Sequence, residues 1–297
     1  MNIHIQQAMN GLGDTIYEIG AVELLVQKYS ANVYIPTSWP QLWKYSKFSD
    51  NIFPIRPPHH NLRTQCKNMK KYDDLFFNLP DKIHRHITQL SYSTYRNLNM
   101  PYYQGLCKSI NVEHSDYHLD LRMPEVQKQN IAIIRPSTIR TEWSVPARSA
   151  RQKYIQLVID YLEEIGIETW VLADVDDVNE KYQEFRPMDA SKYIERGEMS
   201  IDEIIQTVLS SKILISGVGW AAPFSMAWKI PAIIIHGGMG GFNHSDFIHA
   251  PGAGSPIHIL PDKYCMCKNK NHACDKTINE DILIESLKGI IYGNEVA

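Results

Sequence analysis

Short apolar runs alternate with segments of helical periodicity throughout the second half of the chain. The apolar runs predict strands over residues 131–136, 168–174, 213–216 and 232–238. The apolar residues between these runs recur at helical spacing and predict helices over 150–166, 200–212 and 219–229. Strands that alternate with helices form parallel sheets, because each helix returns the chain to the same edge. The predicted fold class is α/β, with a doubly wound parallel sheet.

The first half repeats this pattern more loosely. It predicts a helix over 15–29 and strands over 2–8, 32–37, 52–57, 73–80 and 118–123. Residues 124–130 are polar and include a proline, which is typical of a linker. We therefore expect two Rossmann-like domains, residues 1–125 and 126–297, that face each other across a cleft. In such sheets, ligands bind at the carboxyl ends of the strands.

The bulk composition is that of an ordinary globular protein. The chain has 297 residues, of which 44% are hydrophobic and 21% are charged. No apolar run is long enough to span a bilayer, and no secretory signal precedes the first strand. We expect a soluble, cytoplasmic protein without a membrane span. The sequence does not indicate an oligomeric state.

The charge is unevenly distributed. The net charge is −3, yet residues 59–108 contain eight Lys/Arg, three Asp and no Glu, with several tyrosines and with His59 and His60 at the start. Such a segment predicts an acidic partner, for example DNA or a phosphorylated glycan. The alternative is a solvated surface that acidic residues elsewhere in the fold balance.

A glycine-rich turn with an acidic residue follows the first predicted strand. Residues 10–20 read NGLGDTIYEIG, and Ile16 occupies the position of the third glycine in a dinucleotide-binding motif. Thr15 and Glu18 have the spacing of a capping box, so Asp14 is not needed as the helix cap. Asp14 is therefore a candidate catalytic base at a strand end. The alternative is that it only stabilises the helix dipole.

Three later strand ends carry candidate anion-binding residues. The segment 135–151 has four arginines and one acid, and arginine forks suit a diphosphate. The segments 216–224 and 236–244 are glycine-rich, and backbone N–H groups at a helix start bind anions. The predicted donor-binding residues are Gly13, Arg135, Arg140, Gly217, Gly219, Trp220, Ala221 and Gly238. The alternatives are surface charge packed over Trp143 and tight turns without a ligand.

Three of the five cysteines lie within ten residues of one another. Cys265, Cys267, His272 and Cys274 form the pattern C-x-C-x4-H-x-C. Three thiolates and one imidazole complete a tetrahedral zinc or iron site with no open position, which is typical of a structural metal. The spacing does not distinguish zinc from iron. The alternative is a loop with reduced, unliganded thiols.

These features together resemble glycosyltransferases of the GT-B fold. The Gly-Asp turn, the pattern R-x-x-x-x-R-x-x-W from Arg135 and SG-x-x-W from Ser216 resemble family nine, the ADP-heptose heptosyltransferases. The SGVGW stretch, the cysteine cluster and the following CDKTI are most similar to the autotransporter heptosyltransferase branch and to bacteriophage-encoded relatives. The resemblance covers most of residues 1–30 and 131–290 and is weak over 40–125. Thr141 replaces the family's lysine, and Val218 and Pro223 replace an Asp and a His, so heptose is not implied.

The resemblance implies a nucleotide-sugar-dependent, inverting transferase. Asp14 would be the catalytic base, while Arg140, Arg135 and the amides near residues 219–221 would hold the nucleotide diphosphate. The chemistry would need no catalytic metal, so the Cys/His site would be structural. The acceptor would be a phosphorylated surface glycan or DNA with a hydroxymethylated base. The alternatives are a non-catalytic binding module for nucleotide sugars or nucleic acid, and a reaction without an acceptor such as epimerisation.

Overall fold

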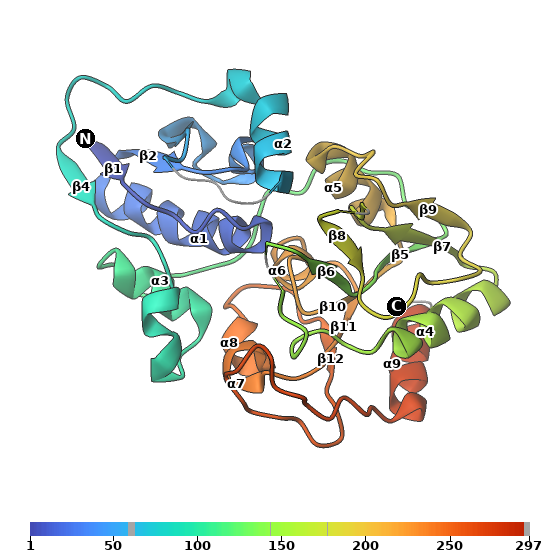
Figure 1. The fold of residues 1–297 in the computed structure, drawn as a ribbon. Helices are drawn as coiled ribbons and strands as arrows, with labels where there is room; N and C mark the ends of the chain where they lie inside the picture. Colours follow the sequence, from blue (N-terminus) through green and yellow to red (C-terminus); the bar gives the residue numbers. More distant parts are fainter. Residues whose placement is uncertain (59–62, 143, 177, 294–297) are drawn as a thin grey trace. The chain divides into compact units, whose positions relative to one another are not determined.

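The computed structural model describes residues 1–58, 63–142, 144–176 and 178–293. His59, His60 and Trp143 lie outside these ranges. The chain forms two compact units (Figure 1). The first contains residues 1–123 with 226–228 and 246–253, and the second contains 124–225, 229–245 and 254–297. No helix among the described residues is long and apolar enough to cross a membrane.

The first unit is built on a four-stranded parallel sheet with the order β3-β2-β1-β4. Its strands are β1 (Asn2–Ile5), β2 (Asn32–Pro36), β3 (Ile52–Ile55) and β4 (Arg85–Ile87). Its helices are α1 (Leu12–Tyr29), α2 (Arg63–Lys71) and α3 (Tyr102–Ser109), with 3-10 turns at Pro40–Tyr45, Ser49–Asn51, Asp73–Leu75 and Ser93–Leu98. Helix α1 is buried from Thr15 to Val26, which accounts for its apolar sequence.

Two strands predicted in this half are wrong. Residues 73–80 form a 3-10 turn and a loop, and the side chains of Phe77 and Leu79 remain 51% and 45% exposed. Residues 118–123 form no strand either, although Leu119 and Leu121 each donate one backbone hydrogen bond to another segment. The fourth strand is β4 instead. An edge strand of arginine, histidine and isoleucine has no apolar pattern that would reveal it.

The second unit is built on a six-stranded parallel sheet with the order β12-β11-β10-β5-β7-β9. Its strands are β5 (Ile131–Arg135), β7 (Glu168–Leu172), β9 (Lys192–Ile194), β10 (Ile213–Gly217), β11 (Ala232–Ile235) and β12 (Ile257–Ile259). A separate antiparallel pair consists of β6 (Thr138–Arg140) and β8 (Glu180–Tyr182). The four strands predicted in this half are confirmed as β5, β7, β10 and β11. Their runs rich in Ile and Val are buried, which is why the apolar pattern revealed them.

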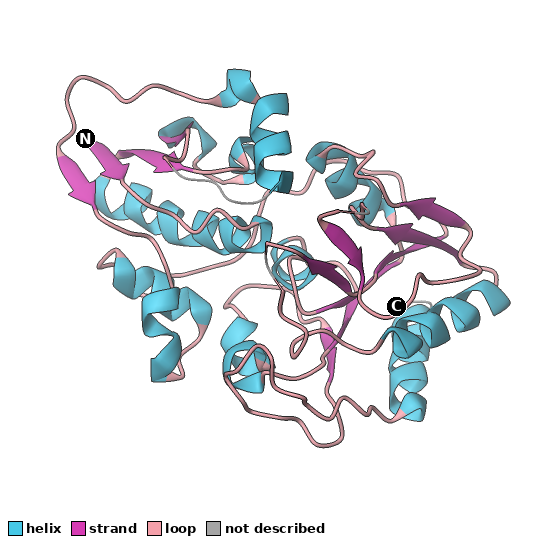
Figure 2. Ribbon diagram, viewed as in Figure 1, coloured by secondary structure: helices cyan, strands magenta, loops and turns pink. Residues whose placement is uncertain are grey.

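The first three helices of the second half confirm the predicted pattern, and the later three were not predicted from the sequence. They are α4 (Gln152–Glu164), α5 (Ile201–Ser210), α6 (Ala221–Ala227), α7 (Gly240–Asn243), α8 (Ser245–Ile248) and α9 (Glu280–Gly293). Helix α5 begins with a complete capping box between Ser200 and Glu203. Helices α4 and α9 lie side by side and bury isoleucines of β5, β10 and β11 (Figure 1). Figure 2 shows that the chain between β12 and α9 is a long loop.

Each of the two parallel sheets has one point at which the strand order reverses. In the first unit the chain runs outward from β1 to β3 and then returns to place β4 on the other side of β1. In the second unit it runs from β5 to β9 and then places β10, β11 and β12 on the other side of β5. Ligands of open α/β sheets bind at the carboxyl ends of strands at such switch points. The carboxyl ends of β1/β4 and of β5/β10 are therefore where functional residues are expected.

Candidate active site and metal centre

The loop after β1 delivers Asp14 to the switch point of the first unit. Helix α1 begins at Leu12, three residues earlier than predicted, and Asp14 lies in its first turn. The predicted capping box is therefore wrong: Thr15 and Glu18 lie inside the helix, and the N-cap is Gly11, which has no side-chain cap. Asn10 turns the chain into the helix with a φ of 58°, a left-handed conformation that asparagine tolerates.

Tyr92 holds the carboxylate of Asp14. The Tyr92 hydroxyl donates a hydrogen bond of 2.5 Å to Asp14 Oδ1, and the Tyr92 ring stacks on Tyr102 with 4.0 Å between centroids. Tyr92 follows β4, so the loops after the two strands that flank the switch point supply one residue each. A Cβ on Gly11 would lie 2.3 Å from Asp14 Oδ2, so a side chain there would displace the carboxylate.

The backbone of the Gly-Asp loop is anchored from two other elements. The carbonyl of Asn10 accepts hydrogen bonds from Trp39 Nε1 at 2.9 Å and from Gln65 Nε2 at 2.7 Å. Gln65 is buried on α2, whose other face carries exposed lysines. A fixed loop keeps the first turn of α1, and with it Asp14, in one place. Sequence reasoning missed Tyr92, Trp39 and Gln65 because no local pattern links them to Asp14.

Predicted donor-binding residues meet at the switch point of the second unit. Arg135 ends β5 and pairs in register with Ser216 of β10, which ends one residue later at Gly217. Residues 218–220 then turn the chain, and α6 begins at Ala221. A Cβ on Gly219 would meet no atom of the described residues within 4 Å, so the space above this glycine is open with respect to them. The structure thus brings Arg135, Gly217, Gly219, Trp220 and Ala221 to one edge.

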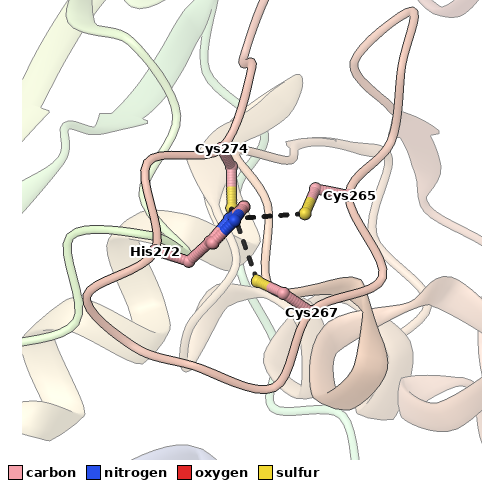
Figure 3. A group of neighbouring side chains, drawn as sticks. All are labelled: Cys265, Cys267, His272 and Cys274. Carbon is pink, nitrogen blue, oxygen red and sulfur yellow. Dashed lines mark hydrogen bonds between the residues drawn. The ribbon is translucent and has the colours of Figure 1, made fainter.

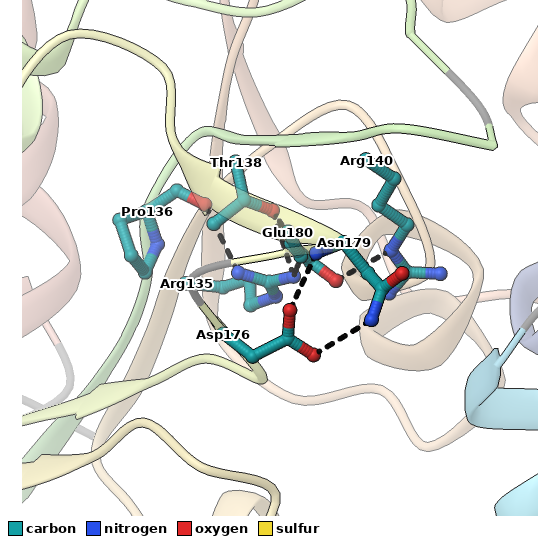
Figure 4. A network of polar contacts seen from close by, with 7 residues as sticks. All are labelled: Arg135, Pro136, Thr138, Arg140, Asp176, Asn179 and Glu180. Atoms are coloured by element: carbon teal, nitrogen blue, oxygen red, sulfur yellow. Dashed lines mark hydrogen bonds and ion pairs between the residues drawn. The ribbon is translucent and has the colours of Figure 1, made fainter.

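Arg135 and Arg140 share one carboxylate that the sequence did not reveal. Glu180 on β8 accepts from Arg135 Nη2 at 3.2 Å and from Arg140 Nε at 2.7 Å, and the Thr138 hydroxyl also donates to it (Figure 4). Burial alone would raise the pKa of Glu180, but the charges of both arginines and the Thr138 hydrogen bond lower it below its ordinary value. Glu180 is therefore a buried, ionised carboxylate.

The two arginines differ in their access to a ligand. The side chain of Arg135 is nearly buried, and its Nη1 donates a hydrogen bond to the carbonyl of Pro136. Burial lowers the pKa of Arg135, and so does the charge of Arg140, whereas Glu180 opposes this shift. The side chain of Arg140 is 28% exposed. Arg140 is thus the member of the pair that reaches solvent, and Arg135 supports the site from within.

The second glycine-rich loop packs against the cysteine segment. A Cβ on Gly238 would lie 2.5 Å from the side chain of Cys274, and one on Gly237 would lie 2.2 Å from the carbonyl of Ser149. The backbone N–H groups of Gly240 and Gly241 donate to the carbonyls of Cys265 and Cys267. Close packing therefore accounts for these glycines, and a contact of Gly238 with the donor stays a prediction.

The predicted metal ligands converge in the structure. One ligand atom from each of Cys265, Cys267, His272 and Cys274 lies within 4.8 Å of all the others (Figure 3). The distances between ligand atoms include Cys267 Sγ–Cys274 Sγ 3.6 Å, Cys265 Sγ–His272 Nδ1 3.5 Å and His272 Nδ1–Cys274 Sγ 3.4 Å. A tetrahedron with metal–sulfur bonds of about 2.3 Å has edges of roughly 3.8 Å. The donor set fits a thiolate-rich metal site, and the cluster could hold zinc or iron.

Comparisons with known proteins identify the fold. No family model and no curated protein matches the chain. The glycosyl transferase family 9 protein of Veillonella parvula aligns with 98% of this chain and 97% of its own, at 14% identity and a TM-score of 0.62. The iron-containing dodecameric glycosyltransferase TibC of enterotoxigenic E. coli aligns with 98% of this chain and 76% of its own, at 11% identity and a TM-score of 0.67.

A third solved structure agrees with these two. The E. coli ADP-heptose lps heptosyltransferase II aligns with 99% of this chain and all of its own, at 10% identity and a TM-score of 0.58. At such identities the likeness establishes the fold and nothing finer. The chain has the α/β fold of family-nine glycosyltransferases, so the fold class predicted from the sequence, GT-B, is confirmed.

Proposed function

We propose that the protein is a nucleotide-sugar-dependent, inverting glycosyltransferase. The observation that carries the proposal is Asp14, a partly exposed carboxylate held by Tyr92 at a switch point of a family-nine glycosyltransferase fold. The carboxylate would remove the proton of an acceptor hydroxyl while that oxygen bonds to the anomeric carbon. The bond from this carbon to the diphosphate breaks on the opposite face, so the configuration inverts.

Residues of the second unit would hold the donor. Arg140 would contact the diphosphate, and Arg135 and Glu180 would keep its guanidinium oriented. The edge formed by Gly217, Gly219, Trp220 and Ala221 would surround the nucleotide, and Gly13 and Gly238 stay predicted donor contacts. E. coli WaaC has been solved with ADP and TibC with an ADP-heptose, which makes ADP-sugars the first donors to test.

The acceptor would be acidic and would bind the unit that contains α2. This helix presents Lys67, Lys70 and Lys71 to solvent, while Gln65 on its buried face holds the Gly-Asp loop. A basic surface connected to the loop of the catalytic base suits a phosphorylated glycan or DNA with a hydroxymethylated base. The assignment of an acceptor domain to residues 1–125 and a donor domain to 126–297 is part of this proposal.

The Cys/His cluster would hold a structural zinc or iron. Its four donors leave no open position and all lie in the loop before α9, so the metal would fix that loop in the conformation whose Cys265 and Cys267 carbonyls accept hydrogen bonds from the glycine-rich loop after β11. TibC is an iron-containing relative in fold, which supports testing both metals. Replacing Cys265 and Cys267 with serine should lower metal affinity by more than roughly 100-fold and lower the Tm as well. If the wild type contains no metal and the serine variants have the same Tm as the wild type, the structural role is refuted.

The first experiment is a donor screen with purified protein. UDP-, GDP-, ADP- and CMP-sugars are tested by thermal shift, and candidate acceptors are then tested by mass spectrometry. Asp14→Asn should bind the stabilising donor as wild type does but reduce transfer by roughly 10²–10⁴-fold. The matched control is Asp50→Asn, an exposed aspartate of the same unit. Full transfer by Asp14→Asn would show that Asp14 is not the catalytic base. If none of the donors stabilises the protein, a non-catalytic binding module is favoured instead.

A further inference from the structure

A second carboxyl group lies one helical turn beyond Asp14. Glu18 follows Asp14 by four residues on α1, so the two side chains share one face of the helix. Glu18 is fully buried, whereas Asp14 is partly exposed. Glu18 Oε1 accepts a hydrogen bond of 2.7 Å from the backbone N–H of Met9, in the Gly-Asp loop. Glu18 Oε2 is also buried and has no hydrogen-bond partner among the described residues.

The surroundings of Glu18 favour its neutral form. Asp14, on the same helix, adds a negative charge, and no cation among the described residues is one of the groups that shift the pKa of Glu18. Tyr92, from the loop after β4, donates to Asp14. An ionised carboxylate with one unpartnered oxygen, and without a cation beside it in the part of the chain that the structure describes, would be costly in this place. A proton on Oε2 removes the charge. Burial, together with the charge of Asp14, raises the pKa of Glu18 from 4.5 to about 8, against the opposing Met9 hydrogen bond.

We propose that Glu18 is a protonated positioning residue for Asp14. The pair then carries one negative charge, and that charge is on Asp14. Asp14 is the better site for it, because it lies in the first turn of α1, receives the Tyr92 hydrogen bond and is partly exposed. The neutral Glu18 anchors the loop through Met9 without competing for the acceptor proton. The catalytic part of this inference rests on the proposed function, and the proton on Glu18 does not.

Infrared spectroscopy tests the proton directly, because a protonated carboxyl has a carbonyl stretch that a carboxylate lacks. Wild type should show this band at neutral pH and lose it with a midpoint near pH 8. Glu18→Gln should lack the band. Glu23→Gln is the matched control, because it alters another buried glutamate of α1 and should leave the Glu18 band in place. A spectrum unchanged by Glu18→Gln would overturn the proposal.

A second variant tests the coupling and does not depend on the folding of Glu18→Gln. Asp14→Asn removes the negative charge that disfavours ionisation of Glu18, so the midpoint of the band should move to lower pH. The measurement requires no substrate. A midpoint that stays in place would show that the two carboxyl groups do not form a pair, and the proposal would fail.

The pH profile of sugar transfer tests the positioning role. Glu18→Gln keeps an acceptor for Met9 and an N–H in place of the O–H, so its transfer rate at pH 7 should lie within about threefold of wild type. Wild type should decline above about pH 8, where Glu18 ionises, and Glu18→Gln should not. A 100-fold loss at every pH, or an identical alkaline decline, would overturn the positioning role. Absence of transfer by wild type would refute the proposed function, while the infrared results would still decide where the proton lies.

Discussion

Two buried glutamates near the switch points of the two sheets have opposite chemistry. Glu18 in the first unit and Glu180 in the second are 0% and 3% exposed. The pKa of Glu18 is raised to about 8, and the pKa of Glu180 is lowered below its ordinary value. Burial raises both pKa values, so burial cannot account for the difference. The difference between these two carboxyl groups comes from the charges and hydrogen-bond donors around them.

The neighbours of the two glutamates explain the contrast. Glu180 accepts from two guanidinium groups and the hydroxyl of Thr138, which together outweigh the cost of burying its charge. Glu18 accepts from one backbone N–H and lies a turn from the negative charge of Asp14. The second unit therefore contains a compensated ionic network, whereas the proposed proton on Glu18 would leave the negative charge of the pair in the first unit on Asp14.

The largest effect that would sharpen this contrast is expected from Glu180→Gln. The substitution leaves the buried Arg135 without its carboxylate, and breaking a buried ion pair in this way costs about 3–5 kcal/mol of unfolding free energy. Urea denaturation at pH 7 measures this loss. Glu285→Gln is the control, because the exposed pair of Glu285 with Lys288 contributes about 1 kcal/mol or less. If the two variants lose equal stability, Glu180 is not the counter-ion described here.

The two glutamates should also give opposite pH dependences of stability. The folded state holds the proton of Glu18 more tightly than the unfolded chain does, so stability falls between about pH 4.5 and pH 8, by at most ~1.4 kcal/mol per pH unit. Glu180 has the opposite sign: its stabilisation is present above the ordinary pKa of 4.5 and is lost as the pH falls through its lowered folded value.

Glu18→Gln isolates the first of these slopes. The stability of the variant relative to wild type should grow from pH 5 to pH 8 and change little above that, as measured by urea denaturation at several pH values. Glu285→Gln should run parallel to wild type over this range. Parallel curves for Glu18→Gln would mean that Glu18 is already ionised near neutrality.

The same contrast shows what sequence reasoning could and could not reach. The strands of the second unit were predictable because their apolar runs are buried, and the Cys/His cluster because its ligands are local in sequence. The Arg135–Glu180 pair spans 45 residues and the Tyr92–Asp14 pair spans 78, and no periodicity encodes contacts at such distances. Strand β4 was missed since an edge strand with one buried residue has no apolar pattern.

A smaller effect should distinguish the two arginines of the network. The side chain of Arg140 is 28% exposed. Its removal leaves no buried charge without a partner, because Glu180 still pairs with Arg135. Arg140→Gln should therefore weaken binding of ADP or the identified donor nucleotide by about tenfold, or ~1.4 kcal/mol, with a smaller loss of stability than Glu180→Gln. Calorimetric titration measures the affinity, with the exposed Arg186→Gln, outside the segment 135–151, as control. Unchanged affinity would remove Arg140 from the proposed donor site.

The smallest effect is expected from Tyr92→Phe, which removes only the hydroxyl that holds Asp14. The ring of Tyr92 would still stack on Tyr102, so the fold around β4 should remain intact. Asp14 is partly exposed, so water can replace the lost donor, and the cost should be about 1 kcal/mol. We expect transfer to fall by roughly fivefold, far less than in Asp14→Asn. If Tyr92→Phe and Asp14→Asn lose transfer equally, the hydroxyl of Tyr92 takes part in the proton transfer itself. The hydrogen-bonded pair of Tyr92 and Asp14 would then be the functional unit of the first sheet, in contrast to the ion pairs of Glu180 in the second.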